Sequence, residues 1–205
     1  AGFDVSYPAA SLLSLHEKYL AELEKEDNLY LYKNVELPLA DVLFSMEKAG
    51  FKIETNVLNA ASEDYKKRLL EINNRIMHLA GQTFNPNSPK QLAEILFEKL
   101  GLKHGKKTKT GYSTGAEVLE EMVGEHPIIP LILEYRQIQK LLSTYIEGFK
   151  PLIDRNTGLI HTVFNQTVTS TGRLSSKEPN LQNIPVRDEE GREIIKFFIP
   201  RNSDG

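Results

Sequence analysis

The stretch of the chain with the densest hydrogen-bonding chemistry runs from residue 167 to residue 185. It reads TVTSTGRLSSKEPNLQNIP, with hydroxyl side chains, one Gly-Arg pair, three amides and Glu178 as its only carboxylate. Such groups bond sugars, phosphates and base edges. No apolar period that would bury a helix face runs through it. Two interpretations follow, a polar surface loop or a nucleic-acid contact surface; the candidate contacts are Thr169, Thr171, Arg173, Asn180, Gln182 and Asn183.

Charge is distributed unevenly along the chain. The formal net charge of −3 argues against a general polyanion binder, but residues 17–27 hold five acidic side chains, whereas residues 99–112 hold five lysines and no acid. Distribution matters more than the sum for electrostatic recognition. The sequence therefore predicts faces of opposite sign, and the basic stretch is the candidate for contacting phosphates.

Composition limits the class of protein. A chain of 205 residues with 40% hydrophobic side chains can form one large or two small domains. The absence of cysteine excludes a disulfide framework, a thiol nucleophile and a cysteine zinc site. No apolar run approaches the roughly 20 residues that span a bilayer, and no signal peptide opens the chain. We expect an intracellular protein.

Long helices must position the polar groups. Apolar spacings of three and four predict helices over 9–25, 29–49, 56–80 and 127–149. The third would be a rod of roughly 37 Å, and the fourth is its expected partner. We expect Pro38 to kink or split the second helix, Thr55 to cap the third, and Pro127 to occupy the first helical position of the fourth. On the fourth helix Arg136, Lys140, Ser143 and Thr144 fall on one stripe, which an ordinary solvated face would also explain.

Two helix starts are predicted between the long helices. Ser88, Pro89 and Gln91 form one capping box, and Thr114 with Glu117 forms another. These caps satisfy orphan N–H groups without any ligand, yet a helix N-terminus is also a ready anion site. Because the GxxxxGK[ST] loop is missing, the phosphates of a nucleic-acid backbone are the preferred anions. The candidates are Asn85, Asn87, Ser88, Lys106, Lys107, Ser113 and Thr114.

The last third of the chain changes character. Residues 154–158 predict a turn, 159–165 a strand, 187–191 a charged turn and 193–199 a second strand. Asp188, Glu189 and Glu190 fall in the charged turn, so we do not assign them as metal ligands. The expected fold class is α+β, mainly α with a small β portion.

Several segments together closely resemble family A DNA polymerases of the bacterial DNA polymerase I type. The most specific is 171–185, with TGRLSS and PNLQNIP; ELPLADVL at 36–43, FNPNS at 84–88, YR at 135–136 and KLLSTY at 140–145 support it. The resemblance covers essentially the whole chain. It implies that residues 1–33 end a 3′–5′ exonuclease-like domain, that 34–150 form a thumb built on a long antiparallel helical hairpin with a tip subdomain, and that 151–205 begin a palm.

The resemblance also implies DNA contacts. The candidates from Asn85 to Thr114, together with Arg136, Lys140, Ser143 and Thr144, occupy positions where the family contacts the DNA backbone. Arg173 matches an arginine directed into the minor groove near the primer terminus, and the three amides match contacts to template and primer. Since A·T and G·C pairs present similar acceptors in the minor groove, such contacts test pairing without reading sequence.

The implied activity is DNA-directed DNA polymerisation in replication and repair, which uses two Mg²⁺ ions held by carboxylates. The first catalytic aspartate of the family would directly follow Gly205, and the fingers helix is also missing. We therefore expect no catalytic residue, metal ligand or cofactor in this chain. The expected partners are double-stranded primer–template DNA and the remainder of the polymerase, in the bacterial cytoplasm at the nucleoid and away from membranes.

Two alternatives stay open at this point. The chain could be one piece of a split or nicked polymerase that is active only with a partner chain, or a non-enzymatic helical interaction module. As for proofreading, Tyr7 matches a family tyrosine that is followed four residues later by a metal-binding aspartate. Ser11 stands at that position here. Serine is a poor Mg²⁺ ligand, so we expect an inactive exonuclease.

Overall fold

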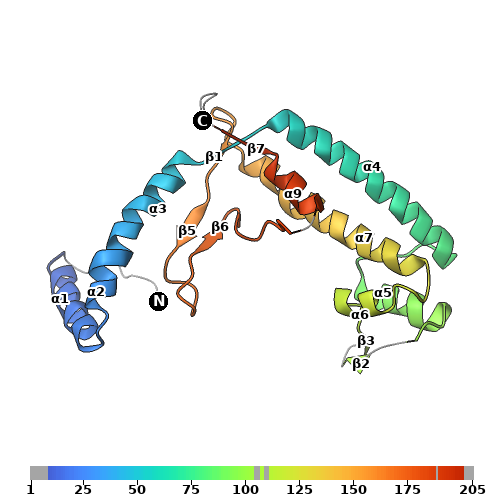
Figure 1. Ribbon diagram of the computed structural model, residues 1–205, viewed down its shortest axis with the longest axis horizontal. Helices are drawn as coiled ribbons and strands as arrows, with labels where there is room; N and C mark the ends of the chain where they lie inside the picture. Colours follow the sequence, from blue (N-terminus) through green and yellow to red (C-terminus); the bar gives the residue numbers. More distant parts are fainter. Residues whose placement is uncertain (1–8, 104–106, 109–110, 188, 201–205) are drawn as a thin grey trace. The chain divides into compact units, whose positions relative to one another are not determined.

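The computed structural model describes residues 9–103, 107–108, 111–187 and 189–200. The chain forms two compact units, each built from two stretches of sequence (Figure 1). The first unit holds residues 1–50 and 161–180, and the second holds residues 51–160 and 181–205. In the described ranges no helix is both long and apolar enough to cross a membrane. The fold is α+β and mainly helical, as the sequence predicted.

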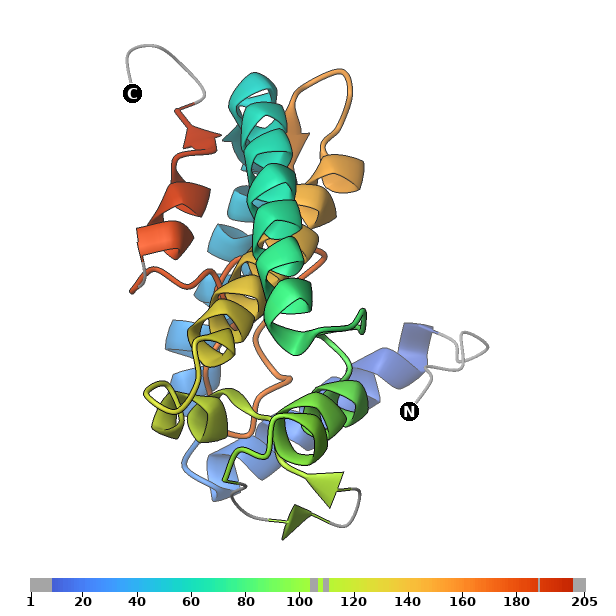
Figure 2. The same ribbon diagram turned by 90° about the vertical axis from the view of Figure 1, so that its right-hand side faces the viewer.

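A pair of long helices forms the body of the second unit. Helix α4 (Thr55–Ala80) packs along α7 (Ile128–Leu141), which continues through the π-helix η3 (Leu142–Ile146), α8 (Glu147–Phe149) and the 3₁₀ turn η4 (Lys150–Leu152) (Figures 1 and 2). Leu58 and Ile76 of α4 are fully buried, as are Ile132 and Ile146 on the other side. The periodicity of the two sequences therefore predicted both helices and their pairing.

The ends of these helices differ from prediction at two positions. Thr55 is already helical, and Glu54 caps α4, because its carboxylate accepts a hydrogen bond from the Asn56 N–H. Pro127 is the residue before α7 rather than its first helical residue. Gly81 ends α4 at a φ of 65°, a conformation that costs glycine little because it has no Cβ.

A connecting segment, residues 82–127, joins the two long helices. It contains α5 (Pro89–Ala93), the π-helix η2 (Glu94–Lys99), the hairpin of β2 (Lys107–Thr108) and β3 (Gly111–Tyr112), and α6 (Ala116–Glu121). Ser88 caps α5 as predicted, its Oγ accepting the Gln91 N–H at 3.4 Å. The cap predicted at Thr114 is wrong. Thr114 is buried, Gly115 precedes α6, and Ser113 Oγ accepts the Gly115 N–H instead.

A small antiparallel sheet closes the other end of the second unit. Strand β1 (Phe51–Ile53) lies between β4 (Leu159–Ile160) and β7 (Phe198–Ile199), with Phe51 opposite Ile160 and Ile53 opposite Phe198. The Phe149 ring packs edge-on against Phe198, with 5.9 Å between ring centroids. The sheet is therefore held by the end of the α7–α8 helix.

The predictions of a charged turn over 187–191 and a strand over 193–199 are wrong in large part. Helix α9 (Glu189–Ile195) occupies this region and only β7 is extended. Ile194 and Phe197 are buried, while Glu193 and Lys196 form an outward ion pair. The two members of each pair are three residues apart, which is the spacing of neighbours on one face of a helical turn. In a strand, side chains alternate between faces, so Glu193 and Phe197 would lie on the same face.

The first unit is built from helices and one hairpin. Helices α1 (Ala9–Lys25), α2 (Leu29–Leu31) and α3 (Leu37–Ala49) follow one another, with the π-helix η1 (Tyr32–Glu36) directly before α3. The helix predicted over 29–49 is thus interrupted by η1, which ends two residues before Pro38, the second residue of α3. Strands β5 (Val163–Asn165) and β6 (Ser175–Lys177) pair with Phe164 opposite Ser176. Glu47 of α3 accepts the Phe164 N–H at 2.6 Å and so ties the hairpin to the helix.

The single strand predicted over 159–165 is broken at His161 and Thr162. Thr162 is buried, and its hydroxyl bonds the carbonyl oxygens of Lys177 at 3.1 Å and Pro179 at 2.7 Å. The residues on either side of the break belong to different units, as β4 and β5. The break is therefore set by a long-range contact that local composition does not reveal.

One ionic cluster links α4 to α8. The Ser62 hydroxyl, which is fully buried, donates to Glu147 Oε1, and the amines of Lys150 and Lys66 lie 3.0 Å and 3.1 Å from the same oxygen. The hydrogen bond from Ser62, followed by that from Lys150, lowers the pKa of Glu147 from its usual 4.5 to about 2. Folding therefore favours the charged carboxylate.

We predict that Glu147→Gln reduces the loss of stability in acid. Because the pKa of Glu147 is lower in the folded chain, its contribution is present above about pH 4.5 and is lost as the pH falls toward about 2. Glutamine keeps an acceptor for Ser62 but has no proton to take up. Urea unfolding at several pH values across this window measures the change. Glu121→Gln on α6 is the control, because it removes a carboxylate outside the cluster. The prediction would be contradicted if the free energy of unfolding fell equally with pH in wild type and in Glu147→Gln.

Candidate nucleic-acid interface

An exposed polar row runs along the α7–η3 helix. Lys140, Ser143 and Thr144 are exposed on successive turns, while Leu141, Leu142 and Tyr145 between them are buried. Lys140 also lines a cavity of about 320 Å³ with Ala116 and Glu120 of α6 and with Pro185. The predicted stripe therefore lies beside both α6 and the 181–187 segment.

Arg136 departs from the solvated stripe. It is half-buried, and its Nε donates to the carbonyl oxygen of Pro86 at 3.1 Å while Nη1 donates to that of Thr114 at 2.5 Å. Burial lowers the pKa of Arg136 below its usual 12.5. This side chain is engaged by the protein itself, so the interpretation of Arg136 as part of an ordinary solvated face is wrong.

The polar turn before α5 is folded by its own side chains. Asn85 Oδ1 accepts the Asn87 N–H at 2.9 Å, and Gln91 Oε1 accepts the Asn85 N–H at 2.7 Å. Gln91 does not complete the predicted capping box with Ser88, because the Ser88 N–H donates to the Asn85 carbonyl oxygen at 2.9 Å instead. The side chains of Asn85 and Asn87 are exposed, that of Ser88 is half-buried and Thr114 is buried. Thr114 is thus poorly placed for a ligand, whereas the two asparagines are accessible.

The segment that carries Gln182 and Asn183 is anchored from beneath. Leu181 and Ile184 pack against the core of the second unit, and the Tyr145 hydroxyl donates to the main-chain oxygen of Asn183. Burial raises the pKa of Tyr145 above its usual 10.0, so the phenol keeps the proton that it donates. The side chains of Gln182 and Asn183 are exposed. Tyr145 was not predicted as a site residue, because in sequence it is one member of an apolar stripe.

Four predicted contacts belong to the first unit. The Thr169 hydroxyl donates to the main-chain oxygen of Arg173 at 2.6 Å and closes a turn in which Gly172 has a φ of 72°. The side chains of Thr171, Arg173 and Asn180 are exposed. Lys106 and the side chain of Lys107 lie outside the described residues, as do Tyr7 and Asp188.

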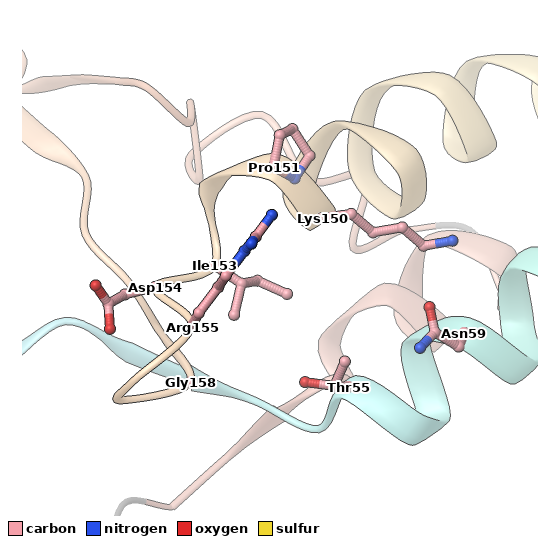
Figure 3. A pocket seen from close by; sticks show the side chains of 8 residues that line it. All are labelled: Thr55, Asn59, Lys150, Pro151, Ile153, Asp154, Arg155 and Gly158. Atoms are coloured by element: carbon pink, nitrogen blue, oxygen red, sulfur yellow. The ribbon is translucent and has the colours of Figure 1, made fainter.

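A second hollow lies at the start of α4, away from the predicted contacts. It has a volume of about 390 Å³ and is lined by residues that include Thr55, Asn59, Lys150 and Arg155 (Figure 3). Asp154 points away from the two basic side chains in this view, and its Oδ1 accepts the N–H groups of Asn156 and Thr157. The lining of this hollow comes from residues 55–59 and 150–158. These two stretches are too far apart in the sequence for a motif to link them.

Acidic side chains are spread over several elements in the part of the chain that the structure describes. Glu189, which was predicted in a turn, is the first residue of α9. Within the described ranges no three His, Asp or Glu side chains come together as a possible metal site.

Comparison with known proteins identifies the family. Residues 55–205 match the model of DNA polymerase family A. The chain belongs to this family. Over 196 residues it is 50% identical to DNA polymerase I of Bacillus subtilis, a match that covers 96% of the chain and 22% of the relative. It is 52% identical over 184 residues to DNA polymerase I of Lactococcus lactis, covering 90% of the chain and 21% of the relative.

A solved structure extends the family likeness to the fold. The POL domain of Pol1 from M. smegmatis, in complex with DNA primer–template and dNTP, superposes with a TM-score of 0.86 at 37% identity. The match covers 93% of this chain and 34% of that one. Against the curated family A relatives named above, the chain spans about a fifth of their length.

We predict that Tyr145→Phe loosens the segment carrying Gln182 and Asn183. The change leaves the Asn183 carbonyl without the hydroxyl donor, at a cost of about 1 kcal/mol in the free energy of unfolding. Urea unfolding at pH 7 measures it. Tyr135→Phe is the matched control on the same helix, since the Tyr135 hydroxyl has no partner among the described residues. Equal losses in the two variants would show that the Tyr145 bond contributes nothing specific.

Proposed function

We propose that this chain is the part of a family A DNA-directed DNA polymerase that holds the primer–template duplex. The observation that carries the proposal is the exposed row of Lys140, Ser143 and Thr144 on a helix that also anchors Gln182 and Asn183. The family match supports it. So does the likeness to a polymerase domain whose structure holds DNA primer–template and dNTP.

The side chains fit a duplex in two ways. The Lys140 ammonium group and the hydroxyls of Ser143 and Thr144 suit phosphate oxygens, which position a duplex without reading its sequence. The amides of Gln182 and Asn183 suit the minor-groove acceptors that all base pairs share. We extend the proposal to Asn85, Asn87 and Ser113 on the connecting segment, and to Thr169, Thr171, Arg173 and Asn180 in the first unit.

Nucleotide transfer is proposed for the whole polymerase rather than for this chain. In that proposal residues 1–33 end the exonuclease-like domain, 34–150 form the thumb and 151–205 begin the palm. The remainder of the enzyme supplies the fingers and the carboxylates that hold two Mg²⁺ ions. The setting is replication and repair in the bacterial cytoplasm. The contribution of this chain is to bind and align the DNA on which that chemistry acts.

Salt dependence of duplex binding tests the proposal. Affinity for a primer–template duplex should fall steeply with salt, because each neutralised phosphate releases counterions. Lys140→Gln should make the slope of log K against log salt shallower by about 0.9. Fluorescence anisotropy with a labelled duplex at several salt concentrations measures both.

The matched control is Lys67→Gln, which removes an exposed lysine from α4 outside the proposed interface. It should leave the slope unchanged. Absence of duplex binding at low salt would refute the proposal and favour the helical interaction module.

Primer extension tests the division of labour. We predict no Mg²⁺-dependent extension by this chain alone, and extension after it is mixed with a separately expressed remainder of the polymerase. A radiolabelled primer resolved on a gel gives the readout, with the remainder alone as the control. Extension by the chain alone would show that carboxylates within it suffice for the chemistry.

A further inference from the structure

Arg136 joins two separate parts of the connecting segment to α7. Its guanidinium bonds the main-chain oxygen of Pro86, 50 residues away in sequence, and that of Thr114, 22 residues away. Pro86 and Thr114 are both buried. Buried carbonyl groups need a donor, and here one side chain serves both. We propose that Arg136 is a positioning residue, which fixes the two polar segments on either side of the lysine-rich stretch instead of contacting a phosphate itself.

The residues next to these carbonyls show what Arg136 positions. Pro86 lies between Asn85 and Asn87, whose side chains are exposed, and Thr114 follows Ser113. The proposal rests on the proposed function in this respect, since these three side chains are proposed DNA contacts. A displacement of either carbonyl would carry the neighbouring polar groups with it.

The geometry of the guanidinium explains why arginine is needed. Its donors are held in a rigid planar fork, so Nε and Nη1 can serve two acceptors at once. A lysine ammonium is a single charged point on a flexible stem. Lysine would keep the positive charge at this position but would not hold both carbonyls in the same arrangement. Charge and positioning can therefore be separated by one conservative substitution.

Arg136 differs in this respect from Lys140, one helical turn further along. The Lys140 side chain is exposed, and its charge is available to solvent. A phosphate contact made by charge tolerates exchange between lysine and arginine better than a forked contact does. Lys140 therefore supplies the matched comparison on the same helix.

The experiment uses Arg136→Lys, Arg136→Gln, Lys140→Arg and Lys140→Gln in the full chain, with duplex affinity measured where circular dichroism shows each variant folded. We expect Arg136→Lys to weaken binding by about tenfold, the loss of one charge-assisted hydrogen bond, and to match Arg136→Gln within about twofold. Lys140→Arg should lose less affinity than Lys140→Gln because it keeps the charge, whereas the two Arg136 variants should lose alike. Wild-type affinity in Arg136→Lys, with a loss only in Arg136→Gln, would show that Arg136 acts by charge and would overturn the proposal.

Hydrogen exchange without DNA provides an independent readout. The amides of Ser88 and Leu92 near the first carbonyl, and of Leu119 near the second, bond main-chain oxygens. They should exchange faster in Arg136→Lys and not in Lys140→Gln. If wild type fails to bind duplex, the proposed function falls and these amides alone decide the positioning role. Unchanged amide exchange in Arg136→Lys would overturn that role. Faster exchange together with wild-type duplex affinity would also overturn it, because it would show that the contact is merely structural.

A measurement on wild type covers the case in which the variants do not fold. Nuclear magnetic resonance should resolve the Arg136 Nε–H signal, with scalar coupling across the hydrogen bond to the Pro86 carbonyl carbon. Exposed Arg155 and Arg173 are the references. A signal for Arg136 that exchanges with solvent as fast as theirs would overturn the proposal.

Discussion

The apolar contact between α4 and the α7–α8 helix is the constraint on which the second unit depends. Leu58 and Ile76 on one side and Ile132, Ile138 and Ile146 on the other are almost completely removed from solvent. Each such side chain contributes about 1.5–3 kcal/mol relative to exposure. With these positions facing inward, the helical period leaves Lys140, Ser143 and Thr144 facing solvent. The apolar residues thus determine where the polar row of the candidate interface lies.

One turn near the end of the same helix supports two further parts of the unit. Tyr145 and Phe149 pack edge-on at 5.9 Å, and Phe149 then contacts Phe198 of the sheet. The hydroxyl of Tyr145 reaches the main chain at Asn183. The sheet and the amide-bearing segment therefore depend on residues 145–149, although both come from chain distant in sequence. A buried tyrosine can do this because its ring packs in the core while its hydroxyl serves a polar group at the edge.

Local sequence predicted those features that local physics controls. The long helices followed from their three- and four-residue periods, and the end of α4 followed from Gly81. The errors arise where tertiary contacts decide. Thr114 has the composition of a cap but is buried, and the strand predicted over 159–165 is broken where Thr162 bonds Lys177 and Pro179. For the candidate site, the side chains of Lys140 and Gln182 are exposed, and their predicted contacts with DNA stay a proposal. The spacing of polar residues along the helix could not show that Arg136 bonds two carbonyl groups from distant parts of the chain.

The electrostatics of the chain explain why two cations on one helix can have different roles. With a net charge of −3, the whole chain does not attract a polyanion, and charges more than about 8–10 Å from a phosphate are largely screened at physiological salt. Binding must then come from a few local cations and from dipoles held in fixed positions. An exposed ammonium such as Lys140 supplies the first. The dipoles are those of neutral side chains next to Pro86 and Thr114. Arg136 holds these dipoles in place, because its guanidinium bonds the two neutral carbonyls of the backbone that carries them.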